Sequence, residues 1–282
     1  MKTTQPLVWF ITGTSSGFGM ELVRAALERG DKVVATSRDP EKVEATFPNC
    51  SDRLLTLRVN LHSVSEMEEA VAVAIATFGK IDVLINNAGY GLIGAIEETS
   101  EKEILELFQI NLFALIRMTR AVLPHFRKNR SGHIVNISSM WGLTAAAGAG
   151  IYNATKFAVE GLSQALVQEV KPLGINVTIV EPGGFRTDFL KESSVHFSSH
   201  LIDDYAETSG LLRAWAKAAH HTQRGDVKLG AEAIINAVTS ERPPLHLLLG
   251  RDAYESAMQH LDEQRREFEA WCEVTCSTDV KN

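Results

Sequence analysis

The chain has 282 residues, which is enough for one large α/β domain or two small domains with a sizeable core. Hydrophobic residues make up 45% and charged residues 22% of the sequence, which is ordinary for a globular protein. The formal net charge of -7 excludes a broad basic surface for nucleic acid or for an anionic membrane.

Cysteine usage and the N-terminus predict a cytoplasmic protein. The three cysteines, Cys50, Cys272 and Cys276, form no CxxC motif, so we expect no disulfide framework and a reducing compartment. Cys272 and Cys276 are one helical turn apart, but no histidine or third cysteine accompanies them, and we expect no metal site. The N-terminus lacks a signal-peptide pattern, and no apolar run reaches the roughly 18–20 residues of a membrane span.

In chain order, short apolar runs alternate with helical patterns. The runs are rich in Val, Ile and Leu and lack tight turns between them, which predicts a parallel sheet covered on both faces. Right-handed crossovers then predict a single Rossmann-type, doubly wound α/β domain over residues 1–282, with about seven strands. The expected strands are 7–12, 32–36, 54–59, 81–85, 133–137, 176–180 and 245–249, and the expected helices are 17–29, 67–78, 101–126 and 156–169.

Two late regions depart from this alternation. Residues 184–225 show no strand pattern and mix aromatic, serine and histidine residues, so we expect a functional flap over a substrate. Residues 252–282 have the composition of a charged helical tail, with a helix expected over 252–274. We expect that helix at the surface or at an interface rather than in a second domain.

A glycine-rich turn at 12–19 (TGTSSGFG) follows the first expected strand and opens the first helix. Its glycines permit a tight turn and a close approach of the backbone to a ligand, and the N–H groups at the helix start suit a pyrophosphate. The GxxxGxG spacing differs from the GxGxxG dinucleotide fingerprint, and a plain strand-to-helix turn is the alternative. The expected cofactor contacts here are Gly13, Ser15, Ser16, Gly17, Phe18 and Gly19.

The end of the second expected strand favours NADP(H) over NAD(H). An NAD-binding protein usually has an acidic residue there, about 20 residues after the glycines, to bind the ribose hydroxyls. This chain has Ser37 and Arg38 instead, so no carboxylate repels a 2′-phosphate and a guanidinium is available to bind it. The alternative is that Arg38 faces solvent or pairs with Asp39.

Four motifs occur in a fixed order along the chain. They are TGxxxGxG at 12–19, NNAG at 86–89, YxxxK at 152–156 and PG at 182–183. Together they resemble the short-chain dehydrogenase/reductase family over roughly residues 7–250. Two further segments, AGYG at 88–91 and EPGGFRT at 181–187, are similar to a branch that includes hydroxysteroid and retinol dehydrogenases.

The resemblance implies four catalytic residues. Tyr152 and Lys156 match the YxxxK motif, and Ser139 lies thirteen residues before the tyrosine, at the end of the fifth expected strand. Ser138 is the competing serine, but the spacing favours Ser139. Asn111, in the middle of the 101–126 helix, resembles the residue that holds a helix open for a water and links the lysine to solvent as a proton relay.

Carbonyl reduction explains why these residue types are needed. Carbon receives a hydride and oxygen receives a proton, but a phenol, with a reference pKa of about 10, is a weak acid at neutral pH. Lys156 lies one helical turn from Tyr152, and its cation is expected to lower the pKa of the phenol. The hydroxyl of Ser139 can donate to the substrate oxygen, where negative charge develops.

The same resemblance implies the rest of the cofactor site. The NNAG segment passes beneath the cofactor, although Asn86 and Asn87 also suit hydrogen bonds that stabilise the sheet. Asn60 and Leu61 replace the usual acidic and apolar pair after the third strand, so we expect altered adenine contacts rather than lost binding. Thr187 resembles the hydroxyl that holds the nicotinamide carboxamide. The expected contacts are Asn60, Leu61, Asn87, Ala88, Gly89, Tyr152, Lys156, Pro182, Gly183, Phe185 and Thr187.

Large apolar side chains near the expected site predict a largely apolar substrate. Trp141 follows Ser139 by two residues, Phe185 and Phe189 follow the Pro-Gly turn, and no basic cluster favours a highly anionic substrate. The alternative is that these aromatic side chains only pack in the core or the flap. The expected substrate contacts are Tyr90, Ser139, Trp141, Gly183 and Phe189.

These inferences predict an NADPH-dependent oxidoreductase that interconverts a carbonyl and an alcohol, with Tyr152 as the acid/base. Two alternatives use the same fold: a cofactor-binding regulator without turnover, and a non-redox enzyme such as an isomerase or cyclase. Helices over 101–126 and 151–169 resemble the pair that forms a four-helix dimer interface in the family, which predicts a homodimer or homotetramer.

Overall fold

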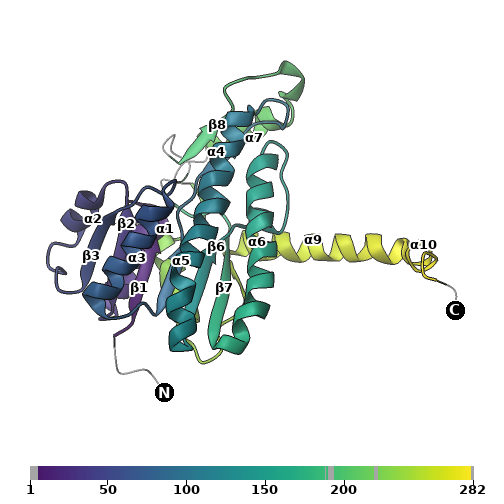
Figure 1. The fold of residues 1–282 in the computed structure, drawn as a ribbon. Helices are drawn as coiled ribbons and strands as arrows, with labels where there is room; N and C mark the ends of the chain where they lie inside the picture. Colours follow the sequence, from purple (N-terminus) through teal and green to yellow (C-terminus); the bar gives the residue numbers. More distant parts are fainter. Residues whose placement is uncertain (1–5, 188, 190–193, 219–221, 281–282) are drawn as a thin grey trace.

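Seven short apolar runs form one parallel sheet in a computed structural model of the chain, which describes residues 6–187, 189, 194–218 and 222–280. The strand order is β3-β2-β1-β4-β6-β7-β9, and each neighbouring pair is parallel (Figure 1). The strands are β1 (Val8–Thr12), β2 (Lys32–Ser37), β3 (Leu54–Arg58), β4 (Val83–Asn86), β6 (Gly132–Ile137), β7 (Ile175–Pro182) and β9 (His246–Leu249). The predicted Rossmann-type sheet is therefore confirmed.

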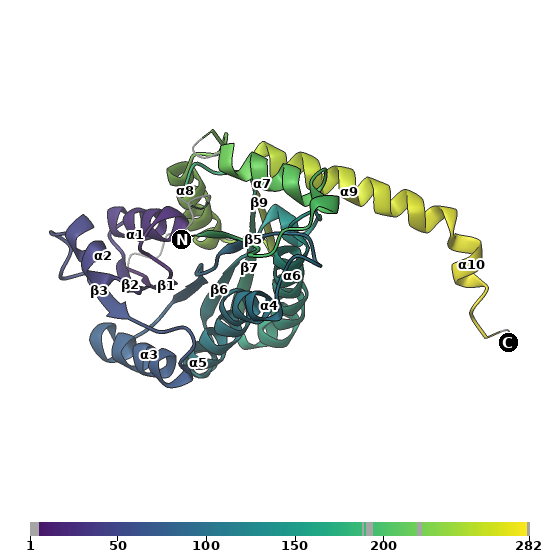
Figure 2. The ribbon, with the colours of Figure 1, turned by 90° about the horizontal axis from the view of Figure 1, so that it is seen from above.

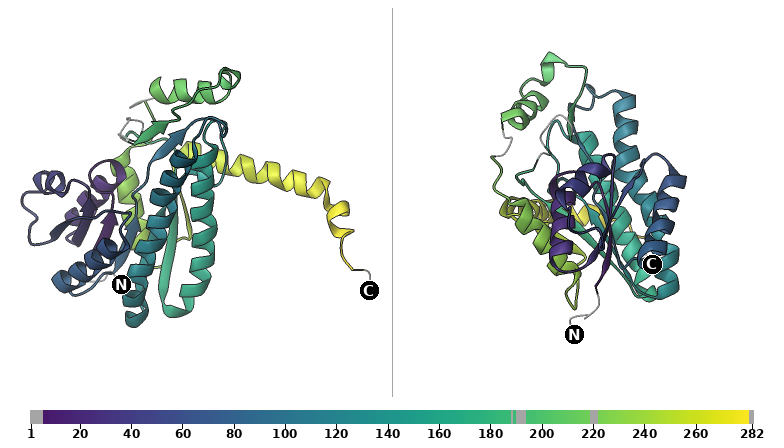
Figure 3. Two further views of the ribbon diagram at one scale, coloured as in Figure 1. Left: turned by 45° about the horizontal axis from the view of Figure 1, so that its top comes forward. Right: turned by 90° about the vertical axis from the view of Figure 1, so that its left-hand side faces the viewer.

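Helices cover both faces of this sheet (Figure 2). The described helices, of which α7, α9 and α10 lie away from the sheet faces (Figure 1 and Figure 3), are α1 (Gly17–Glu28), α2 (Pro40–Thr46), α3 (Val64–Phe78), α4 (Glu101–Phe108), α5 (Ala114–Asn129), α6 (Gly150–Val170), α7 (Ser209–Ala218), α8 (Val227–Val238), α9 (Arg251–Ala270) and α10 (Cys272–Cys276). Trp9 and Ile11 enter the core beneath α1 and α8, whereas Val8 and Phe10 enter the core beneath α3, α5 and α6. Because each strand buries both of its faces, the strands are continuously apolar rather than alternating.

The strand order reverses between β1 and β4. β2 and β3 lie on one side of β1, and β4, β6, β7 and β9 lie on the other. In an open parallel sheet, ligands bind in the crevice outside the carboxyl ends of the strands at such a switch point. The glycine-rich turn after β1 and the NNAG segment after β4 therefore meet at this crevice.

The helix expected over 101–126 is not continuous. It is divided into α4 and α5 by one wide π-helical turn, Gln109–Phe113. Such turns interrupt the regular hydrogen-bond pattern of a helix and are frequent at functional sites. Periodicity could not reveal this turn, because the side-chain pattern continues through it.

The prediction that residues 184–225 contain no strand is wrong. Val195–Phe197 (β8) pairs in parallel with Gly91–Ile93 (β5), which forms a second, two-stranded sheet above the main one. Each strand is only three residues long, and the two are about 100 residues apart, so no local sequence pattern marks either of them. The rest of the flap includes α7, which lies with β8 above the carboxyl ends of the main strands (Figure 1).

The expected C-terminal helical tail is present as α9 and α10. Only Ala253 and Ala257 of α9 are buried, and the helix leaves the body of the molecule (Figure 3). Cys50, Cys272 and Cys276 form no disulfide. Among the described residues, no helix combines the length and the apolarity needed to cross a bilayer.

Candidate active site

The glycine-rich turn adopts a conformation that requires glycine. Gly13 and Gly17 have positive φ angles of 71° and 55°. A Cβ on Gly19 would lie 2.1 Å from the carbonyl oxygen of Gly13, so a side chain there would break the turn. Ser16 precedes α1 without forming a side-chain cap, which leaves the first N–H groups of the helix open to an anion. The turn thus fits a pyrophosphate.

Hydrogen bonds from the β4 end hold this turn in place. The Asn87 side chain donates to the carbonyl oxygens of Thr12 and Gly13, each at 2.9 Å. The Thr12 hydroxyl accepts from the backbone N–H groups of Asn87 at 3.0 Å and Ala88 at 3.1 Å. Sequence reasoning did not include Thr12 as a functional residue. A buried hydroxyl at the last position of an apolar strand is the signal that could have revealed it.

The adenosine end of the crevice carries basic side chains. Ser37 is buried at the end of β2, and its Oγ accepts from the Asp39 N–H at 3.0 Å. Arg38 is exposed, and no carboxylate of the described residues lies within ion-pair distance of it. Arg58 stands in register with Ser37 and pairs with Glu41 at 2.9 Å. Of the two alternatives for Arg38, the pair with Asp39 is not formed among the described residues, and the Arg38 side chain is exposed to solvent.

Asn60 and Leu61 occupy different environments beside the adenosine end. The side-chain carbonyl of Asn60 accepts from the His62 N–H at 3.0 Å and closes a local turn. Only the amide of Asn60 therefore remains to contact an adenine. Leu61 packs against the core beneath α3 and α5.

The π turn places Asn111 between two parts of the site. Its Oδ1 accepts from the Tyr90 N–H at 3.0 Å, and its Nδ2 donates to the Tyr90 carbonyl at 2.9 Å. The same amide lies 3.3 Å from the Thr155 hydroxyl on α6. A Cβ on Gly89 would lie 3.1 Å from Asn111 and 3.8 Å from the amine of Lys156. Asn111 thus joins the NNAG segment to the helix that carries the catalytic pair.

The structure distinguishes the two candidate serines. Ser139 caps a short 3-10 turn and accepts from the Trp141 N–H at 3.1 Å, and its hydroxyl is close enough to Tyr152 to lower the pKa of the phenol. Ser138 is buried on the opposite side, near Glu160. Ser139 is therefore the serine beside the phenol, as its spacing predicts.

Burial governs the charges of the catalytic pair. Burial raises the pKa of Tyr152 to about 12, against the opposing hydrogen bond with Ser139. Burial also lowers the pKa of Lys156 to about 8, against the attraction of Glu160. The expected lowering of the phenol pKa by the lysine is not seen, because burial is the largest effect on the phenol. The Lys156 ammonium instead donates to the Ile137 carbonyl at 2.8 Å. It lies 5.8 Å from the centre of the Tyr152 ring.

The segment after β7 closes the crevice from above. Thr187 is buried, and its methyl group would lie 3.8 Å from a Cβ on Gly17, so it faces the glycine turn. Phe185 instead packs against Phe18, with ring centres 4.9 Å apart. Gly183 faces α9, since a Cβ there would lie 2.3 Å from the Asp252 carboxylate. Phe18, Phe185 and Gly183 can therefore contribute backbone to the site, but their side-chain positions face the protein.

Aromatic rings surround the catalytic tyrosine. The ring centre of Tyr152 lies 6.2 Å from that of Trp141 and 6.4 Å from that of Phe189. Tyr90 packs against the His196 imidazole of the flap at 4.7 Å. His196 was not among the predicted residues, because only the pairing of β8 with β5 brings it to the site. The enclosure is apolar on the side of Tyr152 that faces the flap.

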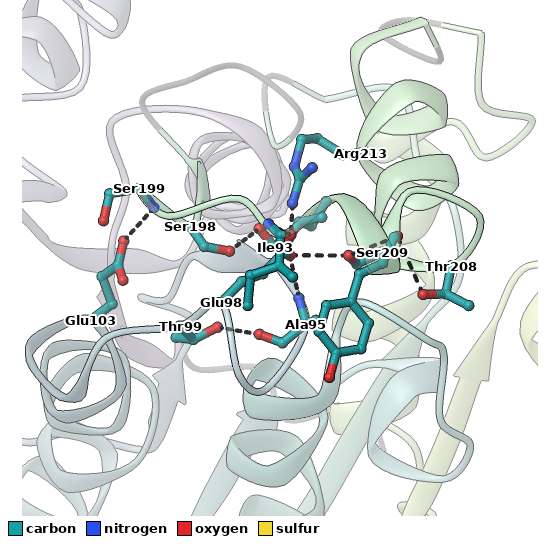
Figure 4. Close-up of polar contacts among 12 residues, drawn as sticks. Ile93, Ala95, Glu98, Thr99, Glu103, Ser198, Ser199, Thr208, Ser209 and Arg213 are labelled. Carbon is teal, nitrogen blue, oxygen red and sulfur yellow. Dashed lines mark hydrogen bonds and ion pairs between the residues drawn. The ribbon is translucent and has the colours of Figure 1, made fainter.

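A buried carboxylate anchors the flap to the body (Figure 4). Glu98 accepts from the N–H groups of Ala95 at 2.8 Å and Ile202 at 3.1 Å. It also accepts from the Ser209 hydroxyl at 3.0 Å and the Arg213 guanidinium at 2.8 Å. Burial alone would raise the pKa of Glu98, but these contacts lower it to about 2. Glu98 therefore stays ionised and holds Ile202 and α7 above the site.

We predict that Glu98→Gln loosens the flap without unfolding the sheet. Removing one partner of a buried ion pair costs about 3–5 kcal/mol and leaves Arg213 without its counter-charge. Hydrogen exchange of the α7 amides should accelerate at least about 100-fold, since about 1.4 kcal/mol corresponds to a factor of ten. Glu97→Gln is the matched control, because Glu97 is exposed and, among the described residues, accepts only from the half-buried Tyr205 hydroxyl at 2.7 Å. Equal exchange rates in the two variants would contradict an anchoring role for Glu98.

The anchor also has a defined pH dependence. Because the pKa of Glu98 is lowered in the folded protein, its stabilisation is complete above the ordinary value of 4.5. That stabilisation should decline as the pH falls from about 4.5 towards about 2. Protection factors of the flap amides, which correct for the intrinsic pH dependence of exchange, should fall across this interval in the wild type and change less in Glu98→Gln.

Comparison with known proteins decides the family. The sequence profile described as short chain dehydrogenase matches residues 7–196 of the chain. This chain belongs to the short-chain dehydrogenase/reductase family. A crystal structure of a short-chain dehydrogenase from Streptomyces avermitilis is 40% identical, with a TM-score of 0.92, over 98% of this chain and 100% of that one. The serine dehydrogenase solved with NADP+ is 27% identical, with a TM-score of 0.74, over 86% of this chain and 94% of that one.

Curated relatives agree with this assignment. The oxidoreductase BOA17 of Botryotinia fuckeliana is 34% identical over 96% of this chain and 98% of that protein. The 3-ketodihydrosphingosine reductase of Bacteroides thetaiotaomicron is 39% identical over 87% of this chain and 88% of that protein. Retinol dehydrogenase 8 of Homo sapiens is 34% identical over 85% of this chain and 80% of that protein. The chain is therefore an oxidoreductase that acts on a carbonyl or alcohol group.

Proposed function

We propose that this enzyme is an NADPH-dependent reductase of a largely apolar carbonyl compound, with Tyr152 as the acid. The observation that carries this proposal is the convergence of Ser139, Tyr152 and Lys156 at the carboxyl ends of the strands, beside the glycine-rich turn. Asn111 ties that group to the NNAG segment. When bound, NADPH supplies the hydride that the carbonyl carbon of the substrate accepts.

The preference for NADP(H) rests on the end of β2. Ser37 occupies the position where a carboxylate would repel a 2′-phosphate, and the Arg38 guanidinium forms no ion pair with the described carboxylates. A guanidinium can bind a phosphate through two parallel hydrogen bonds. The NADP+-bound serine dehydrogenase supports the same preference.

Each side chain of the site has a separate task in the proposed reaction. The Tyr152 hydroxyl gives its proton to the substrate oxygen as negative charge develops there. The Ser139 hydroxyl donates to the same oxygen and steadies it. Lys156, charged at neutral pH, stabilises the phenolate that remains and is positioned by its bond to the Ile137 carbonyl. Asn111 holds the wide helical turn beside Lys156, through which a water can return the proton.

The apolar substrate preference rests on the enclosure around Tyr152. Trp141, Phe189 and Tyr90 present aromatic surface, and Leu92 and Leu107 pack with Tyr152 in one cluster. The names of two relatives, a 3-ketodihydrosphingosine reductase and a retinol dehydrogenase, indicate apolar substrates of those proteins. A panel of long-chain ketones, steroids and retinoids should therefore outperform small polar sugars.

The loss of NADPH absorbance upon addition of that panel tests the proposal as a whole. Turnover of at least one apolar carbonyl supports the reductase. NADPH binding without turnover of any member would favour a cofactor-binding regulator, and product formation without NADPH loss would favour a non-redox enzyme. Faster reduction of the polar sugars than of the apolar carbonyls would contradict the proposed substrate class but not the proposed reductase activity.

We also propose a homodimer in which α9 of each protomer docks on its partner. Tyr254, Met258, Leu261 and Phe268 are spaced four, three and seven residues apart on one face of the helix, and 42–68% of each side chain is exposed. Residues 251–280 contain eight acidic residues and three arginines, whereas α5 contains four basic residues and no acidic one. An open groove of about 580 Å³ beside α4 and α5 is lined in part by Glu101, Lys102, Leu105, Glu106 and Arg117, so the groove itself carries charges of both signs and the basic surplus lies on α5.

The dimer proposal predicts a specific response to charge on the apolar face of α9. Leu261→Asp combined with Phe268→Asp should convert dimer to monomer, because two carboxylates cannot be buried there without partners. Gln259→Asp combined with Ala270→Asp adds the same charge to the opposite face and should leave the dimer intact. Light scattering of the full chain measures the mass. A wild-type monomer, or equal masses for both double variants, would contradict this docking.

A further inference from the structure

Three titratable side chains meet behind the catalytic lysine, outside the site described so far. They are Glu160 on α6, Glu181 on β7 and His246 on β9, and one ligating atom of each lies within 4.8 Å of the others. Glu160 is 4% exposed and Glu181 is fully buried. Glu160 follows Lys156 by one helical turn, so the cluster is adjacent to the catalytic group.

Hydrogen bonding in this cluster is incomplete. His246 Nδ1 lies 2.7 Å from Glu181 Oε1 and 3.8 Å from Glu160 Oε2. Both side-chain oxygens of Glu160 and the Oε2 of Glu181 have no hydrogen-bond partner among the described residues, although all three are buried. Two buried carboxylates this close cannot both remain ionised without a compensating charge. A single proton shared by Glu160 and Glu181 neutralises one of the two carboxylates and gives the pair a hydrogen-bond donor.

The groups around Glu160 are few and come from separate elements. The Ser138 side chain, His246 on β9 and Lys156 on its own helix favour its ionised form, whereas burial and Glu181 on β7 oppose it. Ser138 lies near it at the end of β6. Asp252 on α9 does not join the cluster, because its carboxylate accepts from the Gly184 N–H at 2.6 Å.

We propose that Glu160 and Glu181 share one proton near neutral pH, and that the remaining negative charge keeps Lys156 protonated. Glu160 is then a positioning residue that acts through Lys156 and does not touch the substrate. This proposal rests on the reductase function, since Lys156 matters only there.

Titration behaviour supports this assignment. Burial raises the pKa of Glu160 to about 7 and that of Glu181 to about 8. Burial lowers the pKa of Lys156 to about 8, and Glu160 opposes that lowering. Between about pH 7 and about pH 8, Glu160 and Glu181 lose protons and the pair becomes negatively charged. Lys156 would otherwise lose its own proton in the same pH range. The pair therefore extends the pH range in which the active site holds a cation.

The first test measures the pair itself and needs no activity. Infrared spectra of the wild-type enzyme should show the carbonyl stretch of a buried protonated carboxyl group at pH about 6.5, where ordinary carboxyl groups are ionised. That band should decline as the pH rises above about 8 and should be absent in Glu160→Gln combined with Glu181→Gln. A spectrum without the band would overturn the proposal. So would a stoichiometric divalent metal found by elemental analysis of the purified enzyme, since a cation would replace the proton.

The second test compares the pH profiles of kcat for two matched variants. Glu160→Gln removes the attraction on Lys156, so the alkaline limb should move to lower pH by about one unit. Glu181→Gln leaves Glu160 ionised in the alkaline range, so its alkaline limb should stay close to the wild-type position. A structural role alone would lower activity in both variants at every pH without separating their limbs. An alkaline limb that stays in place in Glu160→Gln, or that moves equally in both variants, would overturn the role of Glu160, whereas the infrared band would still report on the pair if no substrate were reduced.

Discussion

Tyr152→Phe should abolish carbonyl reduction and leave cofactor binding nearly unchanged. The substitution removes only the hydroxyl that gives its proton to the substrate, and kcat should fall by at least about 10³-fold. The ring packs against Trp141 and Phe189, and phenylalanine keeps those contacts. Single-turnover NADPH oxidation measures the loss of activity, and NADPH fluorescence titration measures the Kd.

The control for this variant is Tyr254→Phe, which removes the same hydroxyl from an exposed ring on α9. Its kcat should equal that of the wild type. If Tyr152→Phe retained a comparable kcat, the phenol would not be the acid. If instead its NADPH affinity fell in proportion to its activity, the hydroxyl would act in binding.

Arg38→Glu should reverse the cofactor preference. The guanidinium is expected to bind the 2′-phosphate, and a hydrogen bond to a charged group contributes about 1.5–3 kcal/mol. The kcat/KM for NADPH should therefore fall roughly 10–100-fold, while that for NADH should stay constant or rise. The ratio of the two kcat/KM values, measured with one carbonyl substrate at a single ionic strength, reports the preference directly.

Lys42→Glu provides the matched control, because it makes the same change in net charge on the neighbouring helix α2. It should alter the NADPH/NADH ratio far less than Arg38→Glu does. Equal losses for NADPH and NADH in Arg38→Glu would show that Arg38 supports the adenosine pocket generally, without recognising the phosphate.

Patterns within single elements were sufficient to predict most of the fold. A buried strand in a parallel sheet is apolar on both sides, so each of the seven main strands was visible as a short continuous run. The spacing of Tyr152 and Lys156 along one helix was equally readable, because residues four apart share a helical face. The choice of Ser139 over Ser138 also followed from position in the chain.

Contacts between distant segments could not be predicted. The β5–β8 pairing, the Glu98–Arg213 anchor and the approach of His196 to Tyr90 each join residues about 100 or more positions apart. Periodicity also could not predict the π turn, and only the resemblance of Asn111 to a residue that holds a helix open pointed to an interruption there. In the structure, Asn111 hydrogen-bonds Tyr90 and Thr155, which lie outside the turn.

The sequence by itself determined the family and the order of the motifs along the chain, and it predicted the catalytic side chains, since these depend on residue type and local spacing. The tertiary structure alone decided the charges of those side chains. Burial sets the pKa of Tyr152 and Lys156, and Glu160 acts on Lys156 only within the environment that β7 and β9 complete. Burial is a property of the whole fold, because it depends on which segments exclude water from a given atom.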